Sequence, residues 1–242
     1  PAGCALRPGG RNVTIDRRSF LTAAALAPVA VSAGGMVAAA APGPRAVPMV
    51  GRKAWGAMKP RPGREPHVVR RITLHHSGVR LTDDAQAPGR VRQHQQWHMI
   101  NKGHVDIDYH FLVDRRGTIY QGRNPRFRGD TQTEYDPTGH LLICCEGDYE
   151  GSGGQRPSGA MLKSLVRLMA ATAQRYNVPV RRIRGHRDYS DQTDCPGSRF
   201  EALITDGSVA ARVTETMARG AWVARRLPTA EGRTLIRRIE SL

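Results

Sequence analysis

Aromatic residues, acidic residues and long apolar runs are all scarce in this chain of 242 residues. Phe, Trp and Tyr together make up 5% of the sequence, and there are only four cysteines. No window holds the roughly eighteen strongly apolar residues that a membrane span needs, and four cysteines cannot form a disulfide-dense scaffold. No basic helix is interleaved with aromatic side chains, so we expect no nucleic-acid partner. These absences exclude a membrane-spanning protein and a disulfide-stapled mini-domain.

What the chain does have is positive charge and enough apolar residues for a core. Lys and Arg number 37 against 21 Asp and Glu, a net charge of +16, and hydrophobic residues make up 39% of the sequence. The length fits one domain with appendages, and we expect a monomer. A charge of this size favours association with polyanions, such as anionic wall polymers. The alternative is a solvated basic surface without a specific partner.

The first 45 residues differ in composition from the rest. Arg17 and Arg18 precede an Ala-rich apolar run over residues 22–33, and small residues follow. This layout is typical of an export signal, and the paired arginines resemble a twin-arginine signal. We therefore expect residues 1–45 to be a signal region, with Val13 as an alternative start, and the protein to be exported to the cell envelope or beyond. The alternative is an Ala-rich surface helix behind a chance Arg pair.

The remaining chain divides into three parts. Residues 46–66 are crowded with Pro and Gly, which predicts an irregular lead-in. Residues 67–205 carry the regular patterns of a folded domain, and residues 206–242 are expected to form a helical tail. The patterns in the domain predict strands at 68–77 and 141–145, a hairpin of 109–113 and 118–121, and helices at 88–101, 158–176 and 195–204. This order predicts a mixed α/β fold, a single domain with a central mixed β-sheet flanked by helices.

Three positions among the histidines and cysteines suggest a metal site. His75 and His76 end the first expected strand, His186 lies in a polar segment, and Cys195 immediately precedes Pro196 at an expected helix start. A cysteine at the N-cap of a helix is favoured as thiolate, the form that binds zinc. Two imidazoles and one thiolate would leave a fourth position for water, as in catalytic zinc sites.

The spacing leaves alternatives open. Neighbouring strand residues face opposite ways, so His75 and His76 should not both be ligands. The other interpretation is that the strand-end histidine is satisfied within the fold, that His186 is a surface residue, and that the thiol of Cys195 is inert.

The chain resembles the zinc-dependent N-acetylmuramoyl-L-alanine amidases, which share a fold with peptidoglycan recognition proteins and the phage amidase-type lysozymes. The resemblance covers roughly residues 50–205. Five segments carry it in order: Ile72-Thr73-Leu74-His75-His76-Ser77, Trp97-His98-Met99, Asp106 to Val113 running on through Gly117 to Gly122-Arg123, Gly185-His186-Arg187, and Thr193-Asp194-Cys195-Pro196-Gly197.

The resemblance implies one Zn²⁺ held by His75, His186 and Cys195. It implies Tyr109 as the active-site tyrosine, and Thr193 as a second group that stabilises the oxyanion. Non-catalytic relatives typically lack the cysteine ligand, so the presence of Cys195 favours an enzyme.

The expected substrate is peptidoglycan or a muropeptide, cleaved at the amide between N-acetylmuramic acid and L-alanine. His98, His104 and Arg123 are expected to line the substrate groove, with His98 as a buttress and Arg123 facing a stem-peptide carboxylate. Gly103-His104 replaces a Gly-Trp pair of relatives that favour diaminopimelate, so the stem-peptide type stays open. A non-catalytic peptidoglycan receptor is the alternative function, and a basic binder of wall polymers or nucleic acid is a third hypothesis.

Overall fold

The computed structural model describes residues 43–242, which form one compact unit. The expected signal region lies outside the described residues, apart from its last three positions. Within the described part, no helix combines the length and the apolarity needed to cross a membrane.

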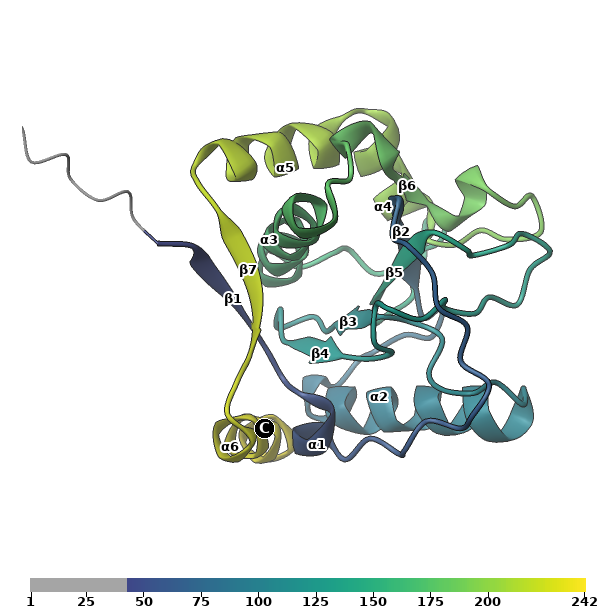
Figure 1. Ribbon diagram of the computed structural model, residues 1–242, viewed down its shortest axis with the longest axis vertical. Helices are drawn as coiled ribbons and strands as arrows, with labels where there is room; N and C mark the ends of the chain where they lie inside the picture. Colours follow the sequence, from purple (N-terminus) through teal and green to yellow (C-terminus); the bar gives the residue numbers. More distant parts are fainter. Residues whose placement is uncertain (1–42) are drawn as a thin grey trace, which may run out of the picture. The chain divides into compact units, whose positions relative to one another are not determined.

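A five-stranded mixed sheet forms the centre of the domain (Figure 1). The middle strand β5 is buried at every position and runs parallel to both of its neighbours, β3 and β2, while β4 pairs antiparallel with β3 in the expected hairpin. Across the sheet the strands are β4 (Ile119–Gln121), β3 (Phe111–Val113), β5 (His140–Cys145), β2 (Arg71–His76) and β6 (Ile183–Gly185). The expected mixed sheet is therefore confirmed.

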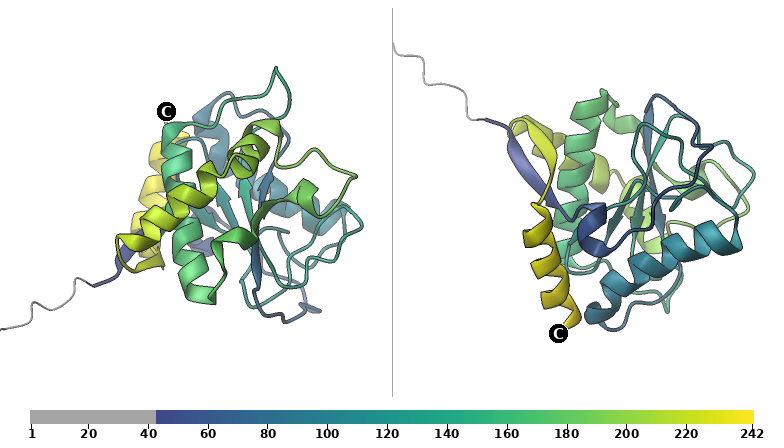
Figure 2. Two further views of the ribbon diagram at one scale, coloured as in Figure 1. Left: turned by 90° about the horizontal axis from the view of Figure 1, so that it is seen from above. Right: turned by 60° about the horizontal axis from the view of Figure 1, so that its bottom comes forward.

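Strand alternation gives the sheet two apolar faces, and helices cover both. Leu141, Ile143 and Cys145 belong to the larger core cluster, while Cys144 faces the second cluster. The larger core packs under α3 (Gly159–Tyr176), α4 (Ser198–Thr205) and α5 (Ser208–Ala218). The other face is covered by α2 (Ala87–Gln96), α1 (Arg52–Trp55) and α6 (Thr229–Glu240), which the right-hand view of Figure 2 brings forward together.

Local sequence explains the two long helices of the central part. The Ser158 side chain accepts a hydrogen bond from the backbone N–H of Met161 and so caps α3, as its sequence predicts. Helix α2 continues as a π-helical turn, Trp97–Asn101, and Gly103 follows with a φ of 73°. The π turn widens the helix where its last residues approach the sheet, a feature often found at functional sites.

The lead-in is more regular than its sequence predicts, and the tail combines the expected helical structure, in α5 and α6, with an unexpected strand. Strand β1 (Arg45–Met49) spans the last residue of the expected signal region and the start of the supposed irregular lead-in. It pairs in parallel with β7 (Trp222–Arg226), a strand within the supposed helical tail. The backbone N–H of Trp222 also donates a hydrogen bond to the side-chain oxygen of Gln174 on α3. Each strand is too short to be predicted from its own sequence pattern. Its backbone N–H and C=O groups are satisfied only by pairing with a strand 170 or more positions away.

Candidate metal centre

Three segments at one edge of the sheet bring the sequence-predicted ligands together. His75 lies at the end of β2, His186 directly follows β6, and Cys195 lies in the segment before α4. Because β2 and β6 are parallel, their carboxyl ends meet at the same edge, which is where open α/β sheets place their sites. The fold therefore creates the cluster from strand order.

The three side chains form a compact, buried donor set. The ligand atoms of His75, His186 and Cys195 all lie within 4.8 Å of one another, and the Cys195 sulfur is 3.5 Å from Nδ1 of His75. Each residue is less than a tenth exposed. Burial is the largest cause of a low pKa in both histidines: the pKa of His75 lies well below its ordinary value, and that of His186 is about 4. Both rings are therefore neutral at pH 7.

Strand alternation selects His75 over its neighbour, as the sequence predicts. Leu74 belongs to the core under α3, so His75 points to the opposite face. Nδ1 of His76 instead accepts a hydrogen bond from the backbone N–H of Tyr149. Only one imidazole of the pair therefore faces Cys195.

Two threonines orient the His186 ring, and sequence reasoning missed both. The hydroxyl of Thr133 lies 2.8 Å from Nε2 of His186, and that of Thr131 lies 3.2 Å from the same atom. Nδ1 is therefore the ring nitrogen left for a metal. The neighbouring Asp188 accepts from the backbone N–H of Gly185 instead. Thr131 and Thr133 lie more than 50 positions from His186, so nothing local in the sequence marks them.

Cys195 is not the helix N-cap that its sequence context predicts. Helix α4 begins at Ser198, and Gly197 stands at the position before it. Burial raises the pKa of the Cys195 thiol to about 12. The thiol therefore stays protonated at neutral pH unless a cation lies beside it, because burial outweighs the backbone N–H of His76 that faces the sulfur.

The donor set fits zinc. A tetrahedral zinc bound to sulfur and imidazole nitrogen separates those two atoms by about 3.6 Å, close to the Cys195–His75 distance. The Cys195 sulfur faces Nδ1 of His75, so that ring atom would bind the ion, while the buried Nε2 has no hydrogen-bond partner within residues 43–242. A divalent ion would also favour the thiolate of Cys195 that burial opposes.

Tyr109 and Thr193 lie next to the donor set. The Tyr109 ring centroid is 5.4 Å from that of His75, and burial raises its phenol pKa well above the ordinary value, so the group stays a neutral donor. Thr193 accepts a hydrogen bond from the backbone N–H of Cys195, which leaves its own O–H free to donate. Tyr109 thus lies beside one ligand ring, and Thr193 contacts the backbone of Cys195; their catalytic roles stay predictions.

A histidine and carboxylate cluster supports Tyr109 from the other side. His98 is 3% exposed, and its ring meets the Tyr109 ring edge-on at 5.5 Å. Asp108 contacts both Nε2 of His98 at 3.3 Å and Nδ1 of His104 at 2.7 Å. His98 therefore acts as a buttress, whereas the half-buried His104 retains an edge toward solvent.

Arg123 lines a surface cleft, but most of its side chain is buried and held by the protein itself. Its side chain is 2% exposed, and it donates to the backbone carbonyls of Ile107, Arg128 and Asp106. It also pairs with Asp130 at 2.5 Å. A guanidinium with these partners holds the loop after β4, and its expected contact with a stem-peptide carboxylate stays a prediction.

Comparison with known proteins agrees with this site. The profile of the N-acetylmuramoyl-L-alanine amidase family Amidase_2 matches residues 64–198, more than half of the chain, so the chain belongs to that family. It is 31% identical over 161 residues to peptidoglycan-recognition protein SD of Drosophila simulans, covering 65% of this chain and 84% of that protein. It is 29% identical over 162 residues to N-acetylmuramoyl-L-alanine amidase of Sus scrofa, covering 63% of this chain and 26% of that protein.

Solved structures share the fold. The crystal structure of Drosophila peptidoglycan recognition protein SD superposes with a TM-score of 0.59 at 28% identity, over 65% of this chain and 93% of that one. A mutant of Drosophila PGRP-LB, solved in complex with tracheal cytotoxin, superposes with a TM-score of 0.57 at 25% identity, over 65% and 92%. The central mixed sheet with flanking helices is therefore the peptidoglycan recognition protein fold.

Proposed function

We propose that this protein is an exported, zinc-dependent N-acetylmuramoyl-L-alanine amidase that cleaves the amide between N-acetylmuramic acid and L-alanine in peptidoglycan. The observation that carries the proposal is the convergence of His75, His186 and Cys195 into one buried donor set beside Tyr109. Two imidazoles and one sulfur leave a tetrahedral ion a position for a reacting group, which a structural four-ligand site would close.

A zinc ion in this set would supply Lewis-acid activation of the scissile carbonyl and of water. The chain's own groups set the geometry around it. Thr131 and Thr133 fix the rotation of His186, while the edge of His98 fixes the ring of Tyr109. These contacts hold the groups in place before substrate arrives, which lowers the cost of organising the site.

Tyr109 and Thr193 provide donors for developing negative charge. The raised pKa of Tyr109 keeps its phenolic proton in place, so it can donate to an oxyanion at neutral pH. Loss of one such donor typically costs about 2.7 to 4 kcal/mol of barrier. Cys144 is fully buried, and burial raises its pKa well above the ordinary value, so it offers no base for proton removal.

The closest competing function is peptidoglycan binding without cleavage, the role that the name of the SD relative suggests. Digestion of purified sacculi separates the two functions. An amidase releases L-alanine amino termini from the glycan, loses that activity with a chelator and regains it with zinc. A receptor retains the sacculi and releases no amino termini, and this result would refute the proposal.

A pair of cysteine variants makes the test specific. Cys195→Ser should abolish stoichiometric zinc and amidase activity, because a hydroxyl is a poor zinc ligand. Cys145→Ala removes a buried thiol that faces the core under α3, and it should keep zinc and activity at a stability cost of about 1 kcal/mol. Equal zinc content in wild type and Cys195→Ser would contradict the assignment of this ligand.

A further inference from the structure

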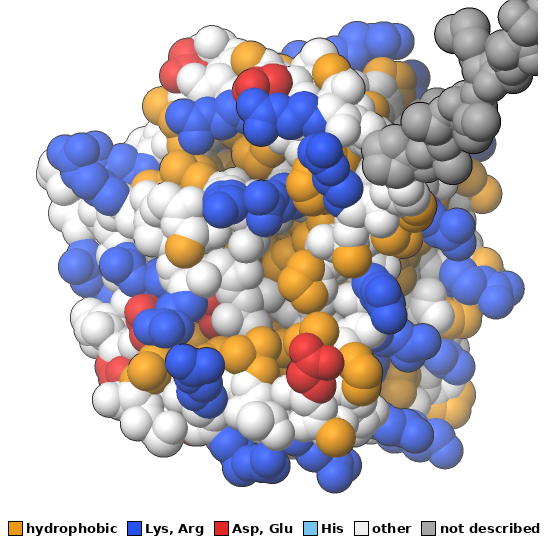
Figure 3. All heavy atoms as spheres, turned by 90° about the vertical axis from the view of Figure 1, so that its left-hand side faces the viewer, with side chains coloured by type: hydrophobic (Ala, Val, Ile, Leu, Met, Phe, Trp, Pro, Cys, Tyr) orange, Lys and Arg blue, Asp and Glu red, His pale blue; other side chains and the backbone are white. Residues whose placement is uncertain are grey.

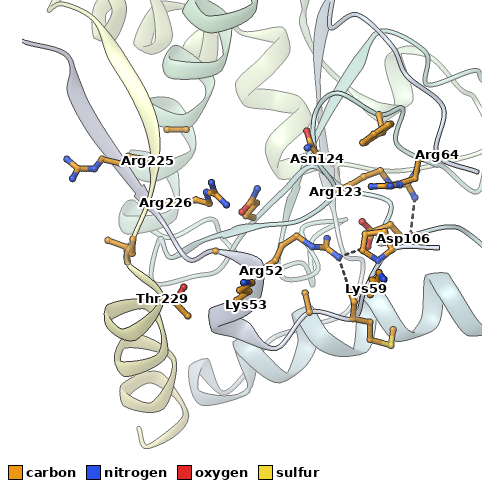
Figure 4. Close-up of a pocket in the computed structure, with 18 of the residues that line it drawn as sticks. Arg52, Lys53, Lys59, Arg64, Asp106, Arg123, Asn124, Arg225, Arg226 and Thr229 are labelled. Carbon is orange, nitrogen blue, oxygen red and sulfur yellow. Dashed lines mark hydrogen bonds and ion pairs between the residues drawn. The ribbon is translucent and has the colours of Figure 1, made fainter. Parts of the chain in front are cut away.

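A large cleft in the described part of the chain lies away from the metal centre. It has a volume of about 990 Å³, and none of the proposed metal ligands lines it. Its walls come from the segment after β1, the end of β4, and the junction of β7 with α6 (Figure 4). Most of these residues fall outside the stretch that matches the amidase family, so this cleft belongs to the terminal segments of this chain.

The cleft is strongly cationic. Five of its lining side chains are exposed Lys or Arg residues, and none of them has an ion-pair partner among residues 43–242. We call this set the rim cations: Lys53, Lys59, Arg64, Arg225 and Arg226. Like charges gathered without a counter-charge repel one another, and a concave wall strengthens their combined potential. The cleft therefore attracts an anion.

The floor beneath the rim cations is fixed by hydrogen bonds. Among residues 43–242, Asp106 is the one acidic residue that lines the cleft. Its carboxylate is buried and pairs with Arg52 at 2.9 Å. Arg52 also donates to the carbonyls of Gly122 and Met58, both at 2.8 Å. The single negative charge is thus neutralised inside the fold and does not offset the rim cations.

Two of the rim cations are held in place by their surroundings. The Arg64 guanidinium lies over the Phe127 ring, 4.6 Å from its centroid. The Arg226 side chain lies beside Gly51, since a Cβ at that glycine would be 3.6 Å from the Arg226 Cδ. Figure 4 shows Arg226 directed toward the cleft and Arg225 directed away from it. Arg226 is therefore placed to contact a ligand, and Arg225 contributes mainly to the field at the edge.

Pairing of β1 with β7 creates this arrangement. In that ladder Met49 is opposite Arg226. The pairing therefore places Arg226 next to the segment that supplies Lys53 and Lys59. Figure 3 shows Lys and Arg side chains spread over this face of the molecule, with few acidic groups among them. Cations that are more than 160 positions apart in sequence thus share one cavity.

We propose that this cleft binds a linear polymer linked by phosphodiesters, of the polyol-phosphate kind. The volume exceeds the need of a single phosphate ion and matches a ligand with several phosphate units. Guanidinium groups bind phosphate oxygens through paired donors, and lysine adds point charge. Apolar lining residues such as Met58 and Leu227 suit the carbon spacers between phosphates.

Other polyanions fit the cleft less well. Arg64 covers the Phe127 ring, and Trp55 is only 1% exposed, so no open aromatic face is available to stack a nucleic-acid base. The rim cations surround a concavity, whereas a planar bilayer surface would meet cations on a convex face. These features favour a flexible, base-free chain of phosphates.

The test compares two triple variants with the same charge change. The cleft variant carries Lys53→Gln, Lys59→Gln and Arg226→Gln. The control carries Lys163→Gln, Arg181→Gln and Arg212→Gln, which are exposed cations outside the cleft. Labelled poly(glycerol phosphate) is titrated by fluorescence anisotropy at several salt concentrations, with both proteins first checked for a wild-type thermal unfolding midpoint.

We expect the cleft variant to bind the polymer at least about tenfold more weakly than wild type, and the control to change less than about twofold. The slope of log K against log salt should fall by about 0.7 for each phosphate contact removed, by analogy with single-stranded polyanions. Equal losses in both variants would overturn the proposal, because binding would then reflect net charge alone.

Competing ligands and hydrogen exchange of the wild-type protein complete the test. Tighter binding of a thymidine oligonucleotide, of phosphatidylglycerol vesicles, or of inorganic phosphate than of the polymer would also overturn the proposal. In wild-type protein, the polymer should slow amide hydrogen exchange over residues 51–64 and 222–229. Slowed exchange around the metal centre alone, without change in these two segments, would place the polymer elsewhere.

Discussion

The Thr133 hydroxyl lies 2.8 Å from Nε2 of His186, on the side of the ring opposite to the atom left for a metal. Contacts of this kind fix the orientation of a ligating imidazole, and their loss typically weakens metal affinity by about 10- to 100-fold. We expect Thr133→Val, which keeps the shape of the side chain, to weaken zinc binding by such a factor, as measured by competition with a chromogenic chelator. Thr138→Val is the control, because that hydroxyl contacts Asp136 instead. Unchanged affinity in Thr133→Val would remove its assigned role.

Tyr109→Phe should separate catalysis from metal binding. The phenol is not part of the donor set, so zinc content should match that of wild type. Without the donor, kcat on a soluble muropeptide should fall by about 10²- to 10³-fold with little change in KM. Tyr176→Phe alters a half-buried tyrosine on α3 and should leave both constants unchanged. A wild-type kcat for Tyr109→Phe would contradict the proposed role of the phenol.

Asp114 should make stability rise on acidification. Its carboxylate is buried at the hairpin turn, where it accepts from the backbone N–H groups of Arg116 and Thr118 and from the Tyr120 hydroxyl. Burial dominates and raises its pKa from 3.8 to about 6. Because the folded state binds the proton more tightly, this contribution to stability is fully present below about pH 4 and is lost as the pH rises through 6.

Relative to Asp114→Asn, wild type should therefore gain roughly 2 to 3 kcal/mol of unfolding free energy between pH 7.5 and pH 4, measured by urea denaturation. The exposed Asp136 provides a control of opposite sign. A hydrogen bond from Thr138 is the largest cause that lowers its pKa, so its contribution is present at neutral pH and is lost as the pH falls. A pH-independent difference between wild type and Asp114→Asn would show that the pKa of this carboxyl is the same in the folded and unfolded states, contrary to the prediction.

Gly232 permits the close contact between α6 and α1. A Cβ at this position would lie 2.8 Å from the Cβ of Ala54, closer than two methyl groups can approach. Gly232→Ala should thus lower the unfolding free energy by about 1 to 3 kcal/mol through overpacking, although alanine is the better helix former by about 1 kcal/mol. The double variant with Ala54→Gly should recover part of the loss, giving a coupling energy that the single variants do not predict.

The control for this helix contact is Gly159→Ala at the start of α3, where an added Cβ meets no atom within 4 Å. Its stability should equal or exceed that of wild type. If Gly232→Ala stabilised the protein as well, the helix contact would be looser than the structure indicates.

Much of the central domain follows from patterns that are local in sequence. The alternation around Leu74 and His75 sets which imidazole faces the metal centre, and the Ser158 cap sets where α3 begins. The hairpin and the apolar run of β5 are likewise encoded by short stretches. Such features depend on steric and hydrogen-bonding preferences within a few residues, so they are visible without a fold.

Other features depend on partners that are distant in the chain. The lead-in and tail become β1 and β7 only because each supplies the other's hydrogen bonds. Arg123, a polar residue that suggests an outward contact, turns inward because backbone carbonyls of two loops converge on it.

The sequence by itself determined the class of the sheet, the face on which His75 lies and the residue types able to bind zinc. The tertiary structure alone decided how Cys195 is buried, which threonines orient His186, and where the unpaired cations gather around one cleft. The reason is physical. Local backbone preferences depend on neighbouring residues in the sequence. Burial, the electrostatic field and the contacts of a ring nitrogen depend on all the residues that the fold places nearby in space.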